Sequence, residues 1–570
     1  MKTSLRLLLP CLLTVFSISV AAQSSARRTN DVVARIREEG LNHSQVMETL
    51  SYLSDVIGPR LTGSPNLRRA NEWTKSKLES WGLTQAHLEG WGPFGRGWSL
   101  QRFSAQLIEP QQIALPGYPK AWSPGLDHPI EAEVIHVEVK SDADYEKYRG
   151  KLQGAVVLIS SVREVRERFD PLATRLGETN LLRLANAGPP TVARVFDRGT
   201  NTARSTNAPV RRNTDPAGRL LSFVSREGAA AVVTSSPQGD AGTFFISQAT
   251  VPAAEPRETN APPSTNAVVR PWAPDAPAFP PQIVLATEEY NRLVRMLKAG
   301  EKLKMALEMK ARFHGDDLMA YNTVAEIPGS DLKDEIVMVG GHLDSWHGGT
   351  GATDNGAGVA CAMEAVRILQ ALHLQPRRTV RVALWTGEEQ GIYGSKAYVS
   401  NHFGYYPTAT AAFDGRRPNN PGTRRSSAET NAVRRLVRQK EYEKLSVYFN
   451  LDNGTGKIRG VHMQGNEAVR PIFRKWLEPF YDLGAETLTL GNTGGTDHLS
   501  FDAIGLPGFQ FIQDPMDYMS RTHHSNADVF DRIQGDDLRQ ASTIMAAFIY
   551  NAAMADERMP RKPEGGAGGR

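Results

Sequence analysis

The sequence predicts an α/β protein with a mixed, largely parallel sheet flanked by helices and interrupted by a β-rich domain. Two observations carry this prediction. From residue 313 onward, apolar strands alternate with helical segments, which is the pattern of a largely parallel sheet. Residues 128–312 instead hold short β-rich runs separated by polar stretches. The chain of 570 residues is long enough for two to four domains.

The chain is expected to begin with a signal peptide over residues 1–22. Lys2 and Arg6 precede an apolar stretch over 7–20, and small residues follow before Gln23, which is typical of a cleaved secretory signal. The apolar stretch is shorter than the ~20 residues of a spanning helix, so we expect no stable membrane insertion. The protein should therefore be secreted or periplasmic. Without the signal, Cys361 is the one cysteine left, which excludes an intramolecular disulfide.

Composition excludes several classes of protein. Apolar residues make up 40% and charged residues 22% of the chain, which argues against wholesale disorder. The formal net charge of +4 is small for this length and gives no reason to expect nucleic acid as a partner.

The elements follow in order along the chain. Apolar residues at helical spacing predict helices around 46–57 and 70–81, with a turn-rich loop over 58–65 between them. Short strands are expected at 134–139, 155–160 and 229–234, with a polar loop at 198–212 and a proline-rich surface loop at 251–281. Further strands are expected at 336–340, 380–385, 447–451 and 509–512, and a helix at 359–372. A polar insertion over 407–440 has no assigned role, and the glycine-rich end over 557–570 is expected to be disordered.

Residues able to bind a metal follow four of the predicted strands. Ligands of α/β sheets bind beyond the carboxyl ends of the strands, so these side chains should share one rim. The set comprises His342 and Asp344 after the first strand, Asp354 in the glycine-rich segment that follows, Glu388 and Glu389 after the second, Asp452 after the third, and His523 and His524 after the fourth.

This set indicates a metal centre. Imidazole and carboxylate ligands suit zinc, and also manganese or cobalt. Five ligands drawn from this set, one of them a carboxylate that bridges two metals, are more than a single tetrahedral site needs. They fit two metals about 3.5–4 Å apart. One of the adjacent glutamates, whose side chains point opposite ways on an extended segment, is then free to act as a general base. The glycine-rich segment over 348–358 lacks the phosphate-loop and dinucleotide fingerprints.

Five segments together resemble the co-catalytic zinc exopeptidase family, namely 342–346, 351–356, 384–391, 452–454 and 523–525. The resemblance runs from about 31 to 556 and implies a zinc exopeptidase-like fold. It identifies 31–127 as the N-terminal part of the peptidase domain and 313–556 as its catalytic part. Residues 128–312 are similar to the protease-associated domain that interrupts the peptidase domain in this family.

The resemblance also implies a role for each site residue. Asp354 would bridge two zinc ions per chain; His342 and Asp452 would complete one site, and Glu389 and His524 the other. Glu388 would be the general base, and Asp344 would orient His342. His524 is preferred to His523 because the ligand of the family directly precedes a serine or threonine.

The expected function is therefore a secreted dinuclear zinc exopeptidase that acts on dipeptides or short peptides. Two alternatives use the same fold. A glutaminyl cyclase-like acyltransferase usually lacks the full second metal set, and a non-catalytic receptor-type protein would be expected to have lost ligands. The sequence leaves open a homodimer, and it leaves open whether the amino or the carboxyl end of the substrate is recognised.

Overall fold

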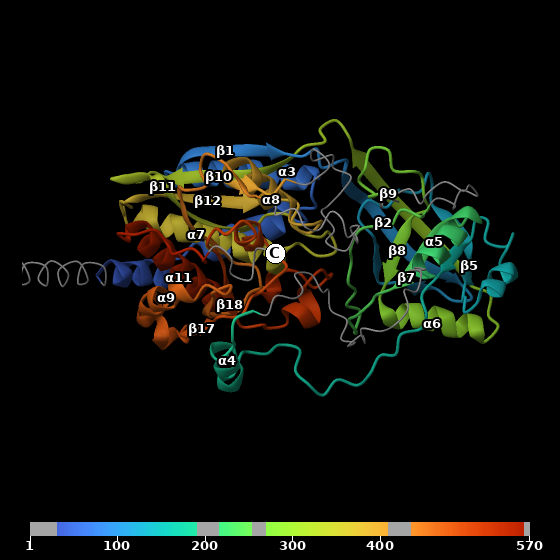
Figure 1. Ribbon diagram of the computed structural model, residues 1–570. Coiled ribbons are helices and arrows are strands. Elements are labelled where there is room, and N and C mark those ends of the chain that lie inside the picture. The colour runs from blue at the N-terminus through green and yellow to red at the C-terminus, as the bar shows by residue number, and fades with distance from the viewer. Residues whose placement is uncertain (1–30, 191–215, 254–268, 408–434, 564–570) are drawn as a thin grey trace, which may run out of the picture.

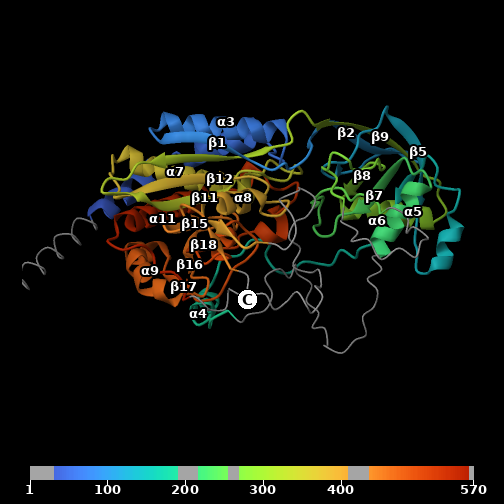
Figure 2. The ribbon, with the colours of Figure 1, turned by 45° about the horizontal axis from the view of Figure 1, so that its top comes forward.

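The computed structural model describes residues 31–190, 216–253, 269–407 and 435–563. Two eight-stranded sheets dominate this part of the chain and form two bodies that lie side by side (Figures 1 and 2). We call them the main body and the second module. The expected signal peptide, the polar loop over 198–212, most of the insertion over 407–440 and the last residues of the tail lie outside the described ranges. Among the described residues, no helix has the length and apolar character needed to cross a membrane.

The sheet of the main body confirms the predicted mixed, largely parallel architecture. Its centre is four parallel strands in the order β12, β11, β15 and β18, and antiparallel strands flank them. From one edge to the other, the strands are β1 (Thr84–Trp91), β10 (Ala320–Ile327), β12 (Arg378–Trp385), β11 (Leu332–His342), β15 (Leu445–Asn450), β18 (Gly508–Gln513), β16 (Ile458–His462) and β17 (Thr487–Thr489). The four strands predicted after residue 313 are β11, β12, β15 and β18.

Helices cover both faces of this sheet. The main body holds a helix over 31–42, α2 (Val46–Ser51), α3 (Pro65–Ser80), α7 (Ala357–Ala371), α8 (Tyr393–His402), α9 (Arg470–Leu477), α10 (His498–Asp502) and α11 (Gly535–Met554). Val337 and Val339 pack in one core with α2, α3, α7 and α11, whereas Ile336 and Met338 pack on the opposite face with α8 and α10. Because side chains of a strand alternate between faces, burial of both faces explains the continuous apolar runs in the sequence.

The described part of the second module has its own sheet, with an α-helix on each face. Its strands, from edge to edge, are β3 (Ile113–Ala114), β2 (Gly97–Glu109), β9 (Lys304–His314), β5 (Ile130–His136), β6 (Val156–Leu158), β7 (Ala231–Ser235), β8 (Gln282–Leu285) and β4 (Gly117–Pro119). Helix α6 (Thr287–Lys298) packs on one face and α5 (Pro216–Arg226) on the other. The strands predicted at 134–139, 155–160 and 229–234 are confirmed as β5, β6 and β7.

The sheet of the second module begins before residue 128, where the sequence placed the start of the inserted segment. Strand β2 pairs with β9 from Gly97 to Glu109, so the sheet reaches back to Gly97. Helix α4 (Glu178–Ala185) lies within the segment 128–312 that was expected to form the inserted domain. It packs instead near β17 of the main body (Figure 1). Arg175, just before α4, contacts the carboxylates of Asp514 at 2.9 Å and Asp537 at 2.7 Å.

Aromatic side chains pack together where the two bodies meet. Trp272 stacks on Phe94 with ring centroids 5.3 Å apart and lies 4.8 Å from Trp122. Trp122 in turn faces Trp346, which follows β11. Trp272 is only 2% exposed, so the expectation of a surface loop over 251–281 is wrong at this residue. A large aromatic side chain gains more by burial than the surrounding prolines do.

The described part of the predicted disordered tail lies on the main body. Met559 donates its backbone N–H to Ser446 at 3.1 Å, and the carbonyl oxygen of Pro560 accepts from Asn466 at 2.8 Å. Arg561 donates to the carbonyl oxygen of Tyr442 at 2.8 Å. The predicted disorder is therefore wrong over 557–563, because side chains of Ser446 and Asn466 and the backbone of Tyr442 hydrogen-bond this segment.

Stability of the main body should depend on pH through His402 at the end of α8. Its ring contacts Glu89 of β1 at 3.0 Å and Glu441 at 3.1 Å. Burial opposes its protonation, but the two carboxylates outweigh burial and raise the pKa of His402 from 6.5 to about 9. Because the pKa of His402 is raised in the folded state, its protonated ring stabilises the fold fully below about pH 6.5. This stabilisation is lost as the pH rises through about 9.

We therefore expect His402→Gln to lower the free energy of unfolding at pH 6, and to lower it less at pH 10. Denaturant unfolding of both proteins at the two pH values measures this difference. His128→Gln, at an exposed position, serves as the control and should differ little from the unaltered chain at either pH. An equal loss at both pH values in His402→Gln would contradict the assigned ion pairs.

Candidate metal centre

Four parallel strands of the main body end beside one another. Strands β12, β11, β15 and β18 are neighbours in the sheet and run in the same direction. His342 is the last residue of β11, and the segments that follow the four carboxyl ends carry the other candidate ligands, including Asp354 in the glycine-rich segment after β11. The sheet therefore brings together residues that are as far as 182 positions apart, from His342 to His524.

The first group of candidate ligands is His342, Asp354 and Asp452. The Nε2 atom of His342 lies 3.4 Å from Oδ1 of Asp354 and 3.5 Å from Oδ1 of Asp452. Each residue offers one ligand atom, and the three atoms lie within 4.8 Å of one another. His342 and Asp354 are buried and Asp452 is half-buried.

The second group of candidate ligands is the same Asp354 with His523 and His524, whose ligand atoms also lie within 4.8 Å of one another, and Glu389 contacts His524. The Nε2 atom of His524 lies 2.9 Å from Oε2 of Glu389 and 3.3 Å from Oδ2 of Asp354. Asp354 thus presents Oδ1 to the first group and Oδ2 to the second. This is the placement that a bridging carboxylate requires.

The residues at this centre fit zinc. Within the described ranges, Oδ2 of Asp354, Oε1 of Glu389 and Oδ1 of Asp452 are buried without a hydrogen-bond partner. Buried carboxylate oxygens are normally hydrogen-bonded or bound to a cation, because an unpaired buried charge is costly. Imidazole and carboxylate donors are the ligand types that zinc takes in catalytic sites.

The pKa values of the site residues reflect crowding by negative charge. Burial raises the pKa of Glu389 to about 7 and raises the pKa of Glu388 well above its usual range. Burial opposes protonation of His342 and His524, but the facing carboxylates outweigh it and raise the pKa of both rings well above 6.5. The same two rings hold the pKa of Asp354 well below its usual range despite its burial. Bound cations would offset this negative charge.

Asp344 connects the ends of β11 and β12. Its carboxylate accepts the backbone N–H of Glu388 at 3.2 Å, that of Glu389 at 3.3 Å and the hydroxyl of Thr62 at 3.0 Å. The Nδ1 atom of His342 lies 3.0 Å from the carbonyl oxygen of Asp344 and 3.6 Å from its carboxylate. Asp344 is therefore placed to orient His342 chiefly through its backbone, while its side chain holds the two glutamates.

The two adjacent histidines differ in their distances to the ligand groups. The Nε2 atom of His523 is 3.8 Å from Asp354, farther than that of His524. The His523 ring stacks on His524 with centroids 3.7 Å apart, and burial lowers the pKa of His523 to about 4. Among the ion pairs of the described residues, Glu389 contacts His524 but not His523.

Three residues near the centre were missed from the sequence. Arg60 is fully buried and donates to the carbonyl oxygens of Leu343, Thr350 and Gly351, which fixes the loop between His342 and Asp354. Asp528 accepts the backbone N–H of Thr353 at 2.5 Å. Tyr518 is buried, and burial followed by the charge of Asp354 raises the pKa of its phenol well above 10.

The sequence carried little signal for these three residues. Arg60 lies in the turn-rich loop over 58–65, where a charged residue is ordinarily exposed. Asp528 and Tyr518 flank the two histidines but lie on no predicted strand end.

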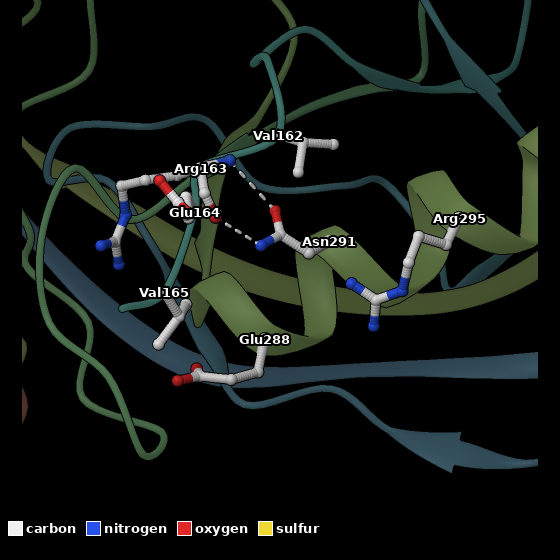
Figure 3. A pocket seen from close by; sticks show the side chains of 7 residues that line it. All are labelled: Val162, Arg163, Glu164, Val165, Glu288, Asn291 and Arg295. Atoms are coloured by element: carbon white, nitrogen blue, oxygen red, sulfur yellow. Dashed lines mark hydrogen bonds between the residues drawn. The ribbon is translucent and has the colours of Figure 1, made fainter. Parts of the chain in front are cut away.

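A pocket in the second module does not belong to this centre. It lies between the segment 162–165 and helix α6 (Figure 3), and Asn291 of α6 binds both backbone groups of Arg163. Its lining residues are Val162, Arg163, Glu164, Val165, Glu288, Asn291 and Arg295. None of the predicted site residues is among them.

Comparison with known proteins identifies the relatives of this chain. Residues 322–549 match the sequence profile of peptidase family M28. Carboxypeptidase Q of Mus musculus is 30% identical over 281 residues, which are 49% of this chain and 52% of that protein. The alignment therefore spans about half the length of this relative. Carboxypeptidase Q of Homo sapiens is 25% identical over 525 residues, which are 92% of this chain and 88% of that protein.

A solved structure has the same fold. The crystal structure of a peptidase M28 precursor from Shewanella amazonensis superposes with a TM-score of 0.60 at 21% identity, over 94% of this chain and 99% of that one. This likeness confirms the expected fold, and residues 322–549 match the profile of the expected family.

Asp344→Asn should weaken metal binding at this centre. Both carboxylate oxygens of Asp344 accept N–H or O–H groups, so an amide NH₂ in place of one oxygen would face a donor. Loss of such an outer partner typically lowers metal affinity about 10–100-fold. Zinc titration against a competing chelator measures the change.

Thr62→Ser keeps the hydroxyl donor and is the matched control, with zinc affinity expected to stay close to that of the unaltered chain. Zinc binding by Asp344→Asn as tight as that of Thr62→Ser would contradict the assigned role.

Proposed function

Because residues 322–549 belong to peptidase family M28, we propose that this protein is a secreted zinc exopeptidase that hydrolyses dipeptides or short peptides with two zinc ions per chain. The observation that carries the proposal is the placement of Asp354, whose two carboxylate oxygens face two separate groups of ligands. The alignment with human carboxypeptidase Q over 92% of this chain supports a carboxypeptidase Q-like exopeptidase. Secretion is proposed from the signal-like residues 1–22.

His342, Asp452 and Asp354 would hold one zinc ion, and Glu389, His524 and Asp354 the other. When bound, zinc would supply Lewis-acid polarisation of the substrate carbonyl and make water more acidic. The ring of His342 points Nδ1 at the carbonyl oxygen of Asp344, which leaves Nε2 as the ligand atom.

Glu388 is proposed as the general base. Its backbone is fixed by Asp344, its side chain is nearly buried, and Glu389 rather than Glu388 contacts His524. Burial raises the pKa of Glu388, so its carboxylate has the proton affinity to accept a proton from the attacking water. The same carboxyl group would then deliver that proton to the leaving amine.

We propose that the β-rich segment over 128–312, together with β2, β3 and β4, is a protease-associated-like inserted domain. The candidate ligand groups found in the described residues lie entirely in the main body, so this domain would shape the substrate cleft without supplying a ligand.

Hydrolysis of a blocked-peptide panel in the presence of zinc tests the proposed function. We expect cleavage of dipeptides or short peptides and loss of that cleavage after prolonged chelation. Cleavage of N-acetylated peptides would exclude an obligatory aminopeptidase, and cleavage of C-amidated peptides would exclude an obligatory carboxypeptidase. Full activity in metal-free protein, or cyclisation of N-terminal glutamine without hydrolysis, would contradict the proposal.

Two neighbouring substitutions should separate the base from the ligand. Glu388→Gln removes the proton acceptor at constant volume and should lower the catalytic rate by a factor on the order of 10²–10⁴, with zinc content kept. Glu389→Gln removes a charged ligand and should lower zinc affinity itself. Bound zinc and rate are measured for both variants across a range of added zinc.

The response to added zinc distinguishes the two defects. The activity of Glu389→Gln should return in part at high zinc, whereas that of Glu388→Gln should not. Loss of zinc in Glu388→Gln with both zinc ions kept in Glu389→Gln would reverse the two roles. An unchanged rate in both variants would exclude this strand end as the active site.

A further inference from the structure

The residue proposed as a ligand on the last loop has an unusual backbone. His524 has a φ of +62°, in the left-handed region that few residues other than glycine adopt. Its carbonyl oxygen accepts the N–H of Ile246, from the second module, at 2.8 Å. A strained backbone of this kind persists only where the surrounding structure holds it.

The surrounding structure is a loop of the second module that pairs with the His524 segment. Phe245 and Ser525 form an antiparallel bridge. The backbone N–H of Asn526 donates to the carbonyl oxygen of Phe244 at 3.1 Å. The side chain of Asn526 accepts the N–H of Phe244 at 2.9 Å and donates to the carbonyl oxygen of Gly242 at 3.3 Å.

This loop is itself anchored to the second module. Phe245 donates its backbone N–H to the hydroxyl of Ser236 at 2.9 Å, and Ser236 directly follows β7. Phe244, Phe245 and Ile246 are all buried. The loop is thus tied to the sheet of the second module rather than free in solvent.

The glycine-rich segment after β11 leaves room for this contact. A Cβ atom on Gly348 would lie 2.7 Å from a side-chain carbon of Ile246, and one on Gly349 would lie 2.9 Å from the carbonyl oxygen of Ser525. Both distances are too short for ordinary packing. Gly348 therefore leaves room for Ile246 of the second module, and Gly349 leaves room for the backbone of the loop that follows His524.

We propose that the loop 242–246 of the second module positions His524 for zinc, with Asn526 as the main side-chain link and Ser236 as its anchor. The inference rests on the proposed function, in which His524 is a zinc ligand. It gives the second module a specific part in the metal centre: it supplies no ligand but fixes the backbone that carries one. His342 ends β11 and Asp452 follows β15, so the main sheet rather than this loop places these two residues.

Zinc titration of the full-length chain tests the proposal without recourse to activity. We expect Asn526→Ala to weaken one of the two zinc ions about 10–100-fold, the range for loss of an outer partner, and to leave the other unchanged. Ser236→Ala, which lies in the second module and touches no proposed ligand, should weaken the same zinc ion to a smaller extent. Asn526→Asp keeps an oxygen that can accept the N–H of Phe244 and should restore part of the affinity.

Asn42→Ala is the control, because Asn42 hydrogen-bonds Glu38 on the exposed surface, and it should bind both zinc ions normally. The melting temperature of the zinc-free variants separates positioning from general stability. Two zinc ions bound at normal affinity by both Asn526→Ala and Ser236→Ala would overturn the inference. Equal weakening of both zinc ions together with a lower melting temperature of the zinc-free chain would overturn it as well.

Failure of the unaltered chain to bind two zinc ions would instead refute the proposed dinuclear function. If Asn526→Ala does not fold, Ser236→Ala decides the question: selective weakening of one zinc ion supports the inference, and normal binding of both overturns it.

Discussion

The structure around the centre depends on keeping the carboxylate of Asp354 buried between two groups of ligands. Its two oxygens face His342 on one side and His524 on the other, and further carboxylates crowd the same space. Such crowding of negative charge opposes folding unless cations compensate it. The strand ends and the hydrogen-bonded segments that follow them hold the candidate ligands in place against this repulsion. Ligands on free loops would move apart.

Arg60 and Asp344, which support the candidate ligands, form hydrogen bonds with backbone groups rather than with the carboxylates of those ligands. The guanidinium of Arg60 is buried among carbonyl oxygens of the loop between His342 and Asp354, and Asp344 accepts backbone N–H groups of the two glutamates. Because neither partner hydrogen-bonds these carboxylates, Asp354 and Glu389 each keep an oxygen without a hydrogen-bond partner. The loops are therefore held in shape while the oxygens stay available to a metal.

The main sheet and the residues at its strand ends could be predicted from the sequence because both rest on local patterns. Strands buried on both faces give apolar runs, as at β11, and polar residues directly after such runs lie at one rim. The start of the second sheet at Gly97, the burial of Trp272 and the role of Arg60 could not be predicted. Each depends on a partner far away in the sequence: β9 for Gly97, Phe94 for Trp272 and the loop after His342 for Arg60.

The two ligand groups differ in what holds them. Sheet hydrogen bonds place the end of β11 and so His342, which makes the first group a direct consequence of the fold of the main body. The second group depends on a left-handed residue, and a backbone in that region costs on the order of 1–3 kcal/mol. Contacts between distant segments must offset this cost, and those contacts come from the second module. The proposed dinuclear centre would therefore require both bodies to fold and to meet, although every proposed ligand belongs to one of them.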